Sequence, residues 1–191
     1  DSQCAYCVIP LARGPARSML QAAVVEQVRL LAARGYREVV LTGINLGSWG
    51  RDTGEGSLAG LLAVLLADPG PAAIGGSAGR DTGASTAATK GAASRIGRYR
   101  LSSIEPLEVD TALLDVIEHA GERVAHHFHL PLQSGSDSVL ARMGRPYSAS
   151  EYLDVADTIA RRFPDAALGA DVIVGFPGET EAEFETLLDF V

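Results

Sequence analysis

Residues 166–178 have the sequence AALGADVIVGFPG, and this stretch decides the fold class. The nearly continuous apolar run at 166–174 predicts a strand of a parallel sheet, because such strands are covered by helices and carry few polar residues. The peptide that follows, Gly175-Phe176-Pro177-Gly178, contains two glycines and a proline and predicts a turn. A strand that ends in such a peptide is typical of α/β proteins whose site lies at the strand ends.

The same arrangement occurs three more times in the chain. Strands are predicted at 38–42, 99–104 and 128–132, followed by the peptides Gly43-Ile44-Asn45, Ser103-Ile104-Glu105-Pro106 and Gln133-Ser134-Gly135. Apolar residues at helical spacing predict helices at 18–34, 57–66, 110–119, 136–143, 149–162 and 181–191. The sequence therefore predicts an α/β fold, a parallel sheet covered by helices, with the polar peptides gathered at the carboxyl ends of the strands.

Two residues mark helix ends. Gly35 stands where a C′ glycine ends the helix at 18–34, and Ser57 is in N-cap position for the helix that follows it.

The segment 68–97 departs from this pattern. It consists mostly of Gly, Ala, Ser, Thr and Pro, with Ile74 and Ile96 as its only large apolar residues. Such a composition cannot bury enough surface to offset the entropy lost on ordering. We predict a disordered surface insertion without a catalytic role.

Composition and charge limit the class of protein. With 191 residues, 47% of them hydrophobic, the chain is long enough for one globular domain. No apolar run approaches the roughly 20 residues of a membrane span, so we expect a cytoplasmic protein without a membrane partner. The net charge of −8 argues against a dedicated nucleic-acid clamp. It leaves room for an enzyme that acts on RNA held by another module.

Cys4 and Cys7 are the only cysteines in the chain. A pair this close is a poor disulfide staple, so the spacing favours metal binding or redox chemistry. A zinc site would need further ligands, for which the histidines within 126–129 are candidates. A thioredoxin-like pair should open a helix, whereas the predicted helix begins only near Ser18. An iron–sulfur site is the third interpretation, and the spacing by itself leaves all three open.

Five peptides resemble, in the same order, those of one family. They are LTGINLGS at 41–48, LSSIEP at 101–106, LPLQSGSD at 130–137, RMGRPY at 142–147 and DVIVGFPGET at 171–180. The opening peptide, Cys4-Ala5-Tyr6-Cys7-Val8-Ile9-Pro10, resembles the end of a C-x3-C-x-aromatic-C loop whose first cysteine directly precedes Asp1. On these residues the chain resembles the radical S-adenosylmethionine (SAM) methylthiotransferases. The resemblance implies a partial (β/α) barrel of the radical SAM type, with its first strand missing from this sequence.

The resemblance also implies the cofactors. Cys4, Cys7 and the preceding cysteine are expected to hold a [4Fe-4S] cluster with one open iron, which the amino and carboxylate groups of SAM fill. Tyr6 stands at the aromatic position of the loop. A second [4Fe-4S] cluster is expected in an N-terminal domain that this sequence lacks.

Eight further residues are carried over as SAM contacts. Gly43 and Asn45 are expected near the methionyl end, Ser103 or Glu105 with Gln133 near the ribose, Arg145 at the carboxylate, and Asp171 with Phe176 beside the adenosine. Simpler roles are open for three of them. Gln133 is in a position to cap the helix at 136–143, Asp171 to satisfy a strand end, and Arg145 to lie on the surface.

The activity implied is methylthiolation at C2 of N6-threonylcarbamoyladenosine at tRNA position 37. The peptides at 43–47 and 102–106 resemble this branch, whereas the sibling that acts on isopentenyladenosine usually ends the second peptide in His-Pro. A sibling that modifies a ribosomal protein and a non-catalytic metal-binding or interaction module are the alternatives. The expected partners are an electron donor and tRNA, held mainly by domains outside this sequence, including a C-terminal RNA-binding domain. The chain alone is expected to be inactive.

Overall fold

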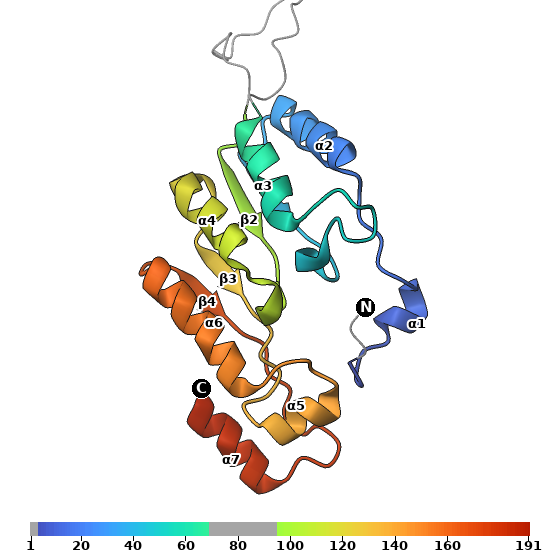
Figure 1. Ribbon diagram of the computed structural model, residues 1–191, viewed down its shortest axis with the longest axis vertical. Coiled ribbons are helices and arrows are strands. Elements are labelled where there is room, and N and C mark those ends of the chain that lie inside the picture. The colour runs from blue at the N-terminus through green and yellow to red at the C-terminus, as the bar shows by residue number, and fades with distance from the viewer. Residues whose placement is uncertain (1–3, 69–94) are drawn as a thin grey trace, which may run out of the picture.

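The computed structural model describes residues 4–68 and 95–191 (Figure 1). Within these residues lie four short parallel strands, β1 (Glu38–Leu41), β2 (Arg98–Leu101), β3 (His127–His129) and β4 (Ala167–Gly169). β1 pairs with β2 and β3 pairs with β4. The pairs are two separate two-stranded sheets. An isolated bridge between Tyr99 and Val124, on the segment that leads into β3, and a hydrogen bond from the Ile104 N–H to the His129 carbonyl place β3 beside β2, in chain order. The predicted parallel α/β fold is confirmed.

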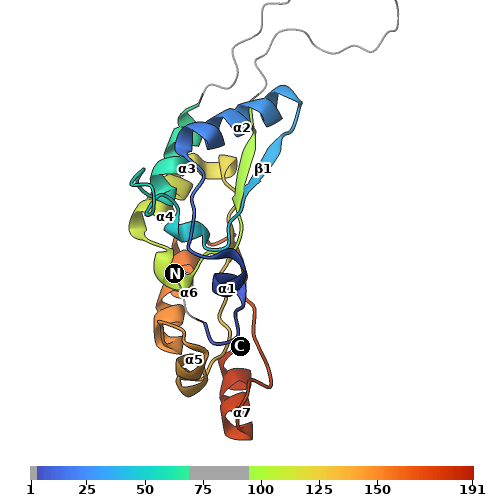
Figure 2. The same ribbon diagram turned by 90° about the vertical axis from the view of Figure 1, so that its right-hand side faces the viewer.

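Helices lie on one side of the strands. α3 (Leu58–Ala67), α4 (Thr111–Ala120) and α6 (Ala149–Arg162) cover this side (Figure 2). Leu41 of β1 and Phe128 of β3 are buried there, whereas Val40 points the other way and is 51% exposed. Successive side chains of a strand point to opposite faces, so this alternation means that the helices cover one face. The prediction of a helix-covered sheet is confirmed for that face alone, and β1, within the strand predicted at 38–42, is buried on one face only.

Local signals set two helix ends as the sequence predicts, whereas the helix predicted from 18 begins only at Gln21. α2 (Gln21–Ala33) ends in a Schellman motif, in which Gly35, at φ 88°, donates its N–H to the Ala32 carbonyl and Tyr36 donates to Leu31. The Ser57 side chain caps α3 by accepting a hydrogen bond from the N–H of Gly60. Two further helices follow the polar peptides, α5 (Asp137–Met143) and α7 (Glu181–Phe190).

The first helix was not predicted. α1 (Ile9–Arg13) follows the cysteines directly, with a proline in its first turn and Gly14, at φ 74°, after its last residue. Proline near the start and glycine past the end are helix signals that five residues of sequence express only weakly. Three 3₁₀ turns complete the described elements, η1 (Leu46–Ser48), η2 (Pro106–Glu108) and η3 (Gly121–Arg123).

The predicted strand at 166–174 is interrupted. Regular pairing stops after Gly169 and resumes as a single bridge between Gln133 and Val172, with the offset between partners shortened by one residue. The extra residue lies on the β3 side, where Pro131 has no N–H to donate to a ladder. Gln133 takes a φ of 69°, donates its N–H to Asp171 and accepts from Ile173. This bulge turns the end of the strand and fixes where Gln133 and Asp171 lie.

The predicted insertion at 68–97 is too wide at both ends. Residues 69–94 lie outside the described residues, but the flanks pack into the fold. Asp68 forms an ion pair with Arg29 at 2.9 Å, Ile96 is 1% exposed, and Gly97 donates to the Arg37 carbonyl. Ile96 packs into the hydrophobic core, and this packing fixes the flank that follows the insertion.

None of the helices in the described part of the chain is long and apolar enough to cross a lipid bilayer.

Candidate functional site

The Cys4–Cys7 loop is docked on the end of α5. Cys7 donates its N–H to the Cys4 carbonyl at 3.0 Å, which closes a turn, and Ala5 donates to the Met143 carbonyl at 2.8 Å. Both thiols are free and half-buried. The loop is thus fixed by backbone hydrogen bonds with both thiols left available as metal ligands.

Arg145 lies beneath this loop. The chain leaves α5 through Gly144, which is left-handed (φ 73°, ψ 31°), and the N–H of Arg145 then donates to the Leu140 carbonyl. This turn carries the Arg145 side chain inward, where it is 3% exposed. The predicted alternative of a surface arginine is therefore wrong.

The guanidinium of Arg145 has four protein acceptors. Its Nη1 donates to Cys4 Sγ at 3.0 Å and to the Tyr6 hydroxyl at 3.3 Å, and its Nε donates to the Tyr147 hydroxyl at 3.1 Å. Its Nη2 forms an ion pair with the Glu105 carboxylate. We call these five residues, which come from three segments of the chain, the Arg145 cluster.

Charge in the Arg145 cluster is fixed by burial and by this ion pair. Burial acts to lower the pKa of Arg145, but the Glu105 carboxylate and the nearby phenols outweigh it, so that its pKa is raised. Burial raises the pKa of Tyr6 and of Tyr147 to about 12 each, against the opposing effect of the Arg145 charge. Near neutral pH the guanidinium of Arg145 is therefore charged, and the phenols of Tyr6 and Tyr147 are neutral. The Tyr147 phenol donates onward to the Pro131 carbonyl at 2.6 Å.

A cavity of about 780 Å³ opens beside the cluster. Its volume is in the range of cofactor sites. Eight of the predicted site residues line it: Cys4, Tyr6, Cys7, Gly43, Asn45, Glu105, Gln133 and Arg145. Gln133 and Arg145 converge on the cavity that Cys4 and Cys7 border, as the sequence predicts.

The remaining predicted residues lie elsewhere. Ser103 and Asp171 do not line this cavity but flank His129, for which the sequence suggested only a role as a candidate zinc ligand. Ser103 Oγ is 2.7 Å from His129 Nδ1, and Asp171 Oδ1 is 3.4 Å from His129 Nε2. A Cβ at Gly169 would lie 3.2 Å from the imidazole, so glycine makes room for the ring. Three neighbouring strands thus place a Ser–His–Asp row near their carboxyl ends.

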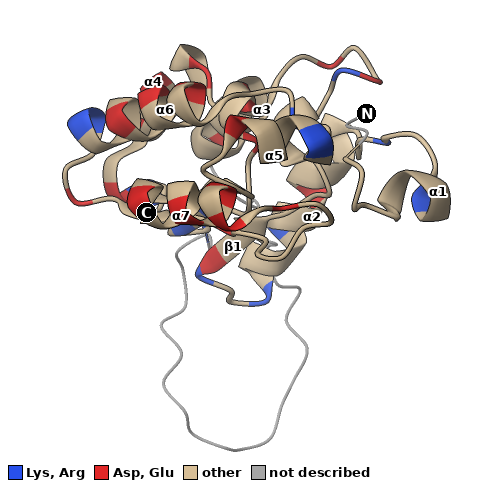
Figure 3. Ribbon diagram, turned by 90° about the horizontal axis from the view of Figure 1, so that it is seen from below, with Lys and Arg blue, Asp and Glu red and all other residues tan. Residues whose placement is uncertain are grey.

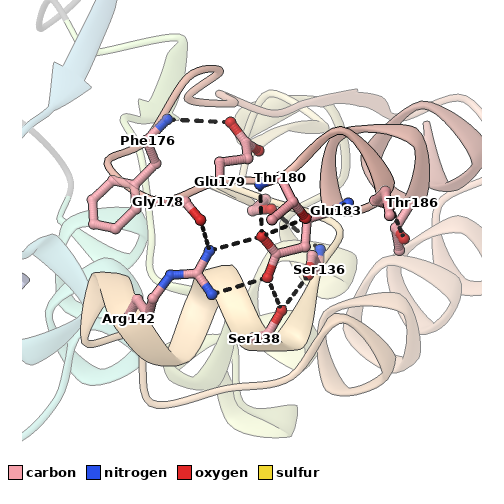
Figure 4. A network of polar contacts seen from close by, with 11 residues as sticks. Ser136, Ser138, Arg142, Phe176, Gly178, Glu179, Thr180, Glu183 and Thr186 are labelled. Atoms are coloured by element: carbon pink, nitrogen blue, oxygen red, sulfur yellow. Dashed lines mark hydrogen bonds and ion pairs between the residues drawn. The ribbon is translucent and has the colours of Figure 1, made fainter.

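Phe176 belongs to a turn that hydrogen bonds connect to α5 and to the start of α7 (Figure 4). Its N–H donates to Glu179 at 3.2 Å. Arg142 of α5 donates to the Gly178 carbonyl at 3.2 Å and forms a bidentate pair with Glu183 of α7 at 2.9 Å. The Arg142 guanidinium, foremost among several donors, holds the pKa of Glu183 well below its usual range. Glu183 also completes a capping box with Thr180, so one carboxylate fixes both the turn and the start of α7.

Sequence reasoning missed three residues of the site. Tyr147 follows Arg145 in the quoted peptide RMGRPY, but nothing in the peptide indicates that its hydroxyl meets the guanidinium. His129 stands at the end of a predicted strand, which was a usable signal. Trp49 lines the cavity and donates its indole N–H to the Met19 carbonyl at 2.9 Å.

Within residues 4–68 and 95–191, no group of three or more His, Cys, Asp or Glu side chains is placed to hold a metal ion. A zinc site that combines the cysteines with histidines is therefore not found there.

Comparison with known proteins places these features in a family. The whole chain, residues 1–191, matches the radical SAM superfamily. The chain belongs to the radical SAM superfamily, and membership implies the two predicted cofactors, a [4Fe-4S] cluster and SAM.

Within that superfamily the chain is similar to methylthiotransferases, which confirms the resemblance found in the peptides. It is 38% identical to the threonylcarbamoyladenosine tRNA methylthiotransferase MtaB of Thermotoga maritima, over 100% of this chain and 38% of the relative. Identity to the enzyme of the same name from Aquifex aeolicus is 39%, over 98% of this chain and 39% of the relative. The tRNA-2-methylthio-N(6)-dimethylallyladenosine synthase of Acetivibrio thermocellus is 34% identical, over 98% of this chain and 34% of the relative. The chain thus spans between a third and two fifths of these relatives.

Proposed function

We propose that this chain is the catalytic core of a tRNA methylthiotransferase. The reaction replaces the C2 hydrogen of a modified adenine by a methylthio group, and the substrate we propose is N6-threonylcarbamoyladenosine at tRNA position 37. The observation that carries the proposal is the Cys4–Cys7 loop on a cavity lined by residues from three strand ends. The names of the similar proteins support the reaction class, because both kinds methylthiolate an adenosine of tRNA.

The residues present fit the implied cluster. Cys4 and Cys7 offer two free thiols on a loop fixed by the backbone, and they border the cavity. Asn45 lines the same cavity, and within the described residues its buried Oδ1 has no hydrogen-bond partner, which is typical of a group that awaits a ligand. When bound, the cluster supplies the electron that cleaves SAM.

The chain's own residues have separate tasks in this proposal. Cys4 and Cys7 bind two of the cluster irons, Asn45 and Gln133 bind SAM, and the apolar wall from α2 and β1 keeps water from the reacting groups. Arg13 and Arg17 also line the cavity and offer positive charge there. The sequence-derived assignment of Phe176 to the adenosine stays a prediction.

We propose that tRNA is held mainly by other parts of the complete protein. α7 carries four carboxylates and no Lys or Arg, and acidic residues recur along α4 and α6 (Figure 3). A phosphate backbone is repelled by such a surface. The chain therefore supplies the reaction site, and a basic module must supply most of the affinity for tRNA.

The cofactor assignment is tested by anaerobic reconstitution of the complete gene product with iron and sulfide. We expect the broad iron–sulfur absorption, a change in the electron paramagnetic resonance (EPR) spectrum on adding SAM, and formation of 5′-deoxyadenosine after reduction. Cys4→Ala and Cys7→Ala should each abolish cluster uptake at this site. Tetrahedral zinc with no iron uptake at these cysteines would contradict the proposal.

The substrate is tested separately with two tRNAs. One carries N6-threonylcarbamoyladenosine at position 37 and the other carries isopentenyladenosine, and digested products are analysed by mass spectrometry. The peptide LSSIEP at 101–106 favours the first. Methylthiolation of the isopentenyladenosine tRNA alone would show that the substrate is that of the sibling enzyme. If neither tRNA is modified, the proposed tRNA substrate is wrong, and only the proposed binding and cleavage of SAM would stand.

A further inference from the structure

The Arg145 cluster contains an unusual hydrogen bond, from a buried guanidinium to a cysteine sulfur. Arg145 Nη1 is 3.0 Å from Cys4 Sγ, and the two residues are 141 positions apart in the chain. The side chain of Arg145 is 3% exposed and Cys4 is half-buried, so this contact is partly shielded from water. Charge-assisted hydrogen bonds in such surroundings are stronger than their counterparts at the surface.

Contacts with Glu105 and Tyr147 fix the orientation of the guanidinium. Glu105 pairs with Nη2, Tyr147 accepts from Nε at 3.1 Å, and the Tyr147 ring lies against the guanidinium with its centroid 4.9 Å from Cζ. Glu105 also provides the counter-charge. A carboxylate ligand would have to displace Glu105 to form a bidentate pair with this arginine.

We infer that Arg145 is a positioning residue for Cys4, whose hydrogen bond to the sulfur raises the reduction potential of the cluster that Cys4 holds. Reduction adds negative charge to the cluster and its thiolates, and a cationic N–H donor stabilises that charge more in the reduced form than in the oxidised form. Tyr6, which accepts from the same Nη1, and Glu105 fix the direction of the donor. The inference rests on the proposed function, because it requires a cluster at Cys4.

The test is a redox titration of the complete, reconstituted protein followed by EPR. Arg145→Lys keeps the charge but loses the fork of donors, and Arg145→Gln loses the charge as well. We expect the midpoint potential to fall in the order wild type, Lys variant, Gln variant. Loss of one charge-assisted hydrogen bond changes an equilibrium by on the order of tenfold, which is about 59 mV for a one-electron couple.

Arg142→Lys is the matched control. It alters an arginine three positions earlier that pairs with Glu183 and does not contact the cysteines. Its midpoint potential should equal that of the wild type. Iron content and circular dichroism (CD) are measured on every variant, and the Lys variant carries the test if the Gln variant does not fold.

Three outcomes overturn the inference in distinguishable ways. An unchanged potential in Arg145→Lys with a full iron content would show that the hydrogen bond does not tune the cluster. Weaker SAM binding by Arg145→Lys at an unchanged potential would assign the arginine to the SAM carboxylate instead. Failure of the wild type to take up a cluster would overturn the proposed function, and this inference with it.

Discussion

Replacing Glu105 by Gln should destabilise the fold because it removes the counter-charge of a buried arginine. Removing one partner of a fully buried ion pair typically costs about 3–5 kcal/mol. Two observations reduce this figure. The Glu105 side chain is 26% exposed, and Arg145 keeps Cys4, Tyr6 and Tyr147 as acceptors. We therefore expect a loss of about 2–3 kcal/mol in the free energy of unfolding.

The assay is urea unfolding of the 191-residue chain, followed by CD at neutral pH. With a urea m-value of about 2 kcal/mol/M, the expected loss lowers the midpoint by about 1 to 1.5 M. Glu183→Gln is the control, because Glu183 pairs with Arg142, whose side chain is 38% exposed. Gln preserves the capping box at Thr180, so this variant should lose much less.

The reasoning is refuted if the two variants lose equal stability, or if Glu105→Gln unfolds at the wild-type midpoint. Either result would mean that the Glu105 carboxylate does not stabilise the fold by pairing with the buried Arg145 guanidinium. The comparison of midpoints holds only if both variants have the same m-value as the wild type.

Three further predictions concern stability. Replacing residues 70–93 by a short Gly/Ser linker should leave the urea midpoint nearly unchanged. Ile96→Ala, at a position 1% exposed, should instead cost about 2–5 kcal/mol. Equal losses in the two variants would contradict the conclusion that Ile96 belongs to the core and not to the insertion. Burial raises the pKa of Glu108 above its ordinary 4.5, so its contribution to stability is present below that value and is lost as pH rises through the raised pKa. Glu108→Gln should therefore melt at a higher temperature than wild type at pH 7, with the difference disappearing near pH 4; a constant difference would refute this. Gly135→Ala places a Cβ 2.7 Å from the Cβ of Phe190 and should loosen α7, measured as faster amide hydrogen exchange in that helix than in α3.

Much of the fold can be predicted from short stretches of sequence, and two helix ends show why. Gly35 ends α2 and Ser57 begins α3 because each satisfies backbone groups within a few positions of itself. Apolar periodicity likewise predicts the strands and the six longer helices, since burial of one face depends on spacing along a single element. These signals were sufficient for the parallel α/β fold.

The limits of the prediction also have physical causes. The strand at 166–174 was predicted without interruption because its apolar run says nothing about its partner, and the bulge arises from Pro131 on the neighbouring segment. Ile96 was assigned to the insertion because its neighbours in sequence are small and polar. Its place in the core depends on elements far from it in the chain.

The sequence by itself determined the fold class, the end of α2, the start of α3 and the residue types that a cluster and SAM require. The tertiary structure alone decided which of those residues meet. Arg145 reaches Glu105 and Cys4 across 40 and 141 positions, and His129 gathers Ser103 and Asp171 from the two neighbouring strands. Such partners depend on strand order, on the bulge and on the turn at Gly144, which act together in three dimensions. Hydrogen bonds and ion pairs form over a few ångströms, so a pattern in one dimension cannot specify them.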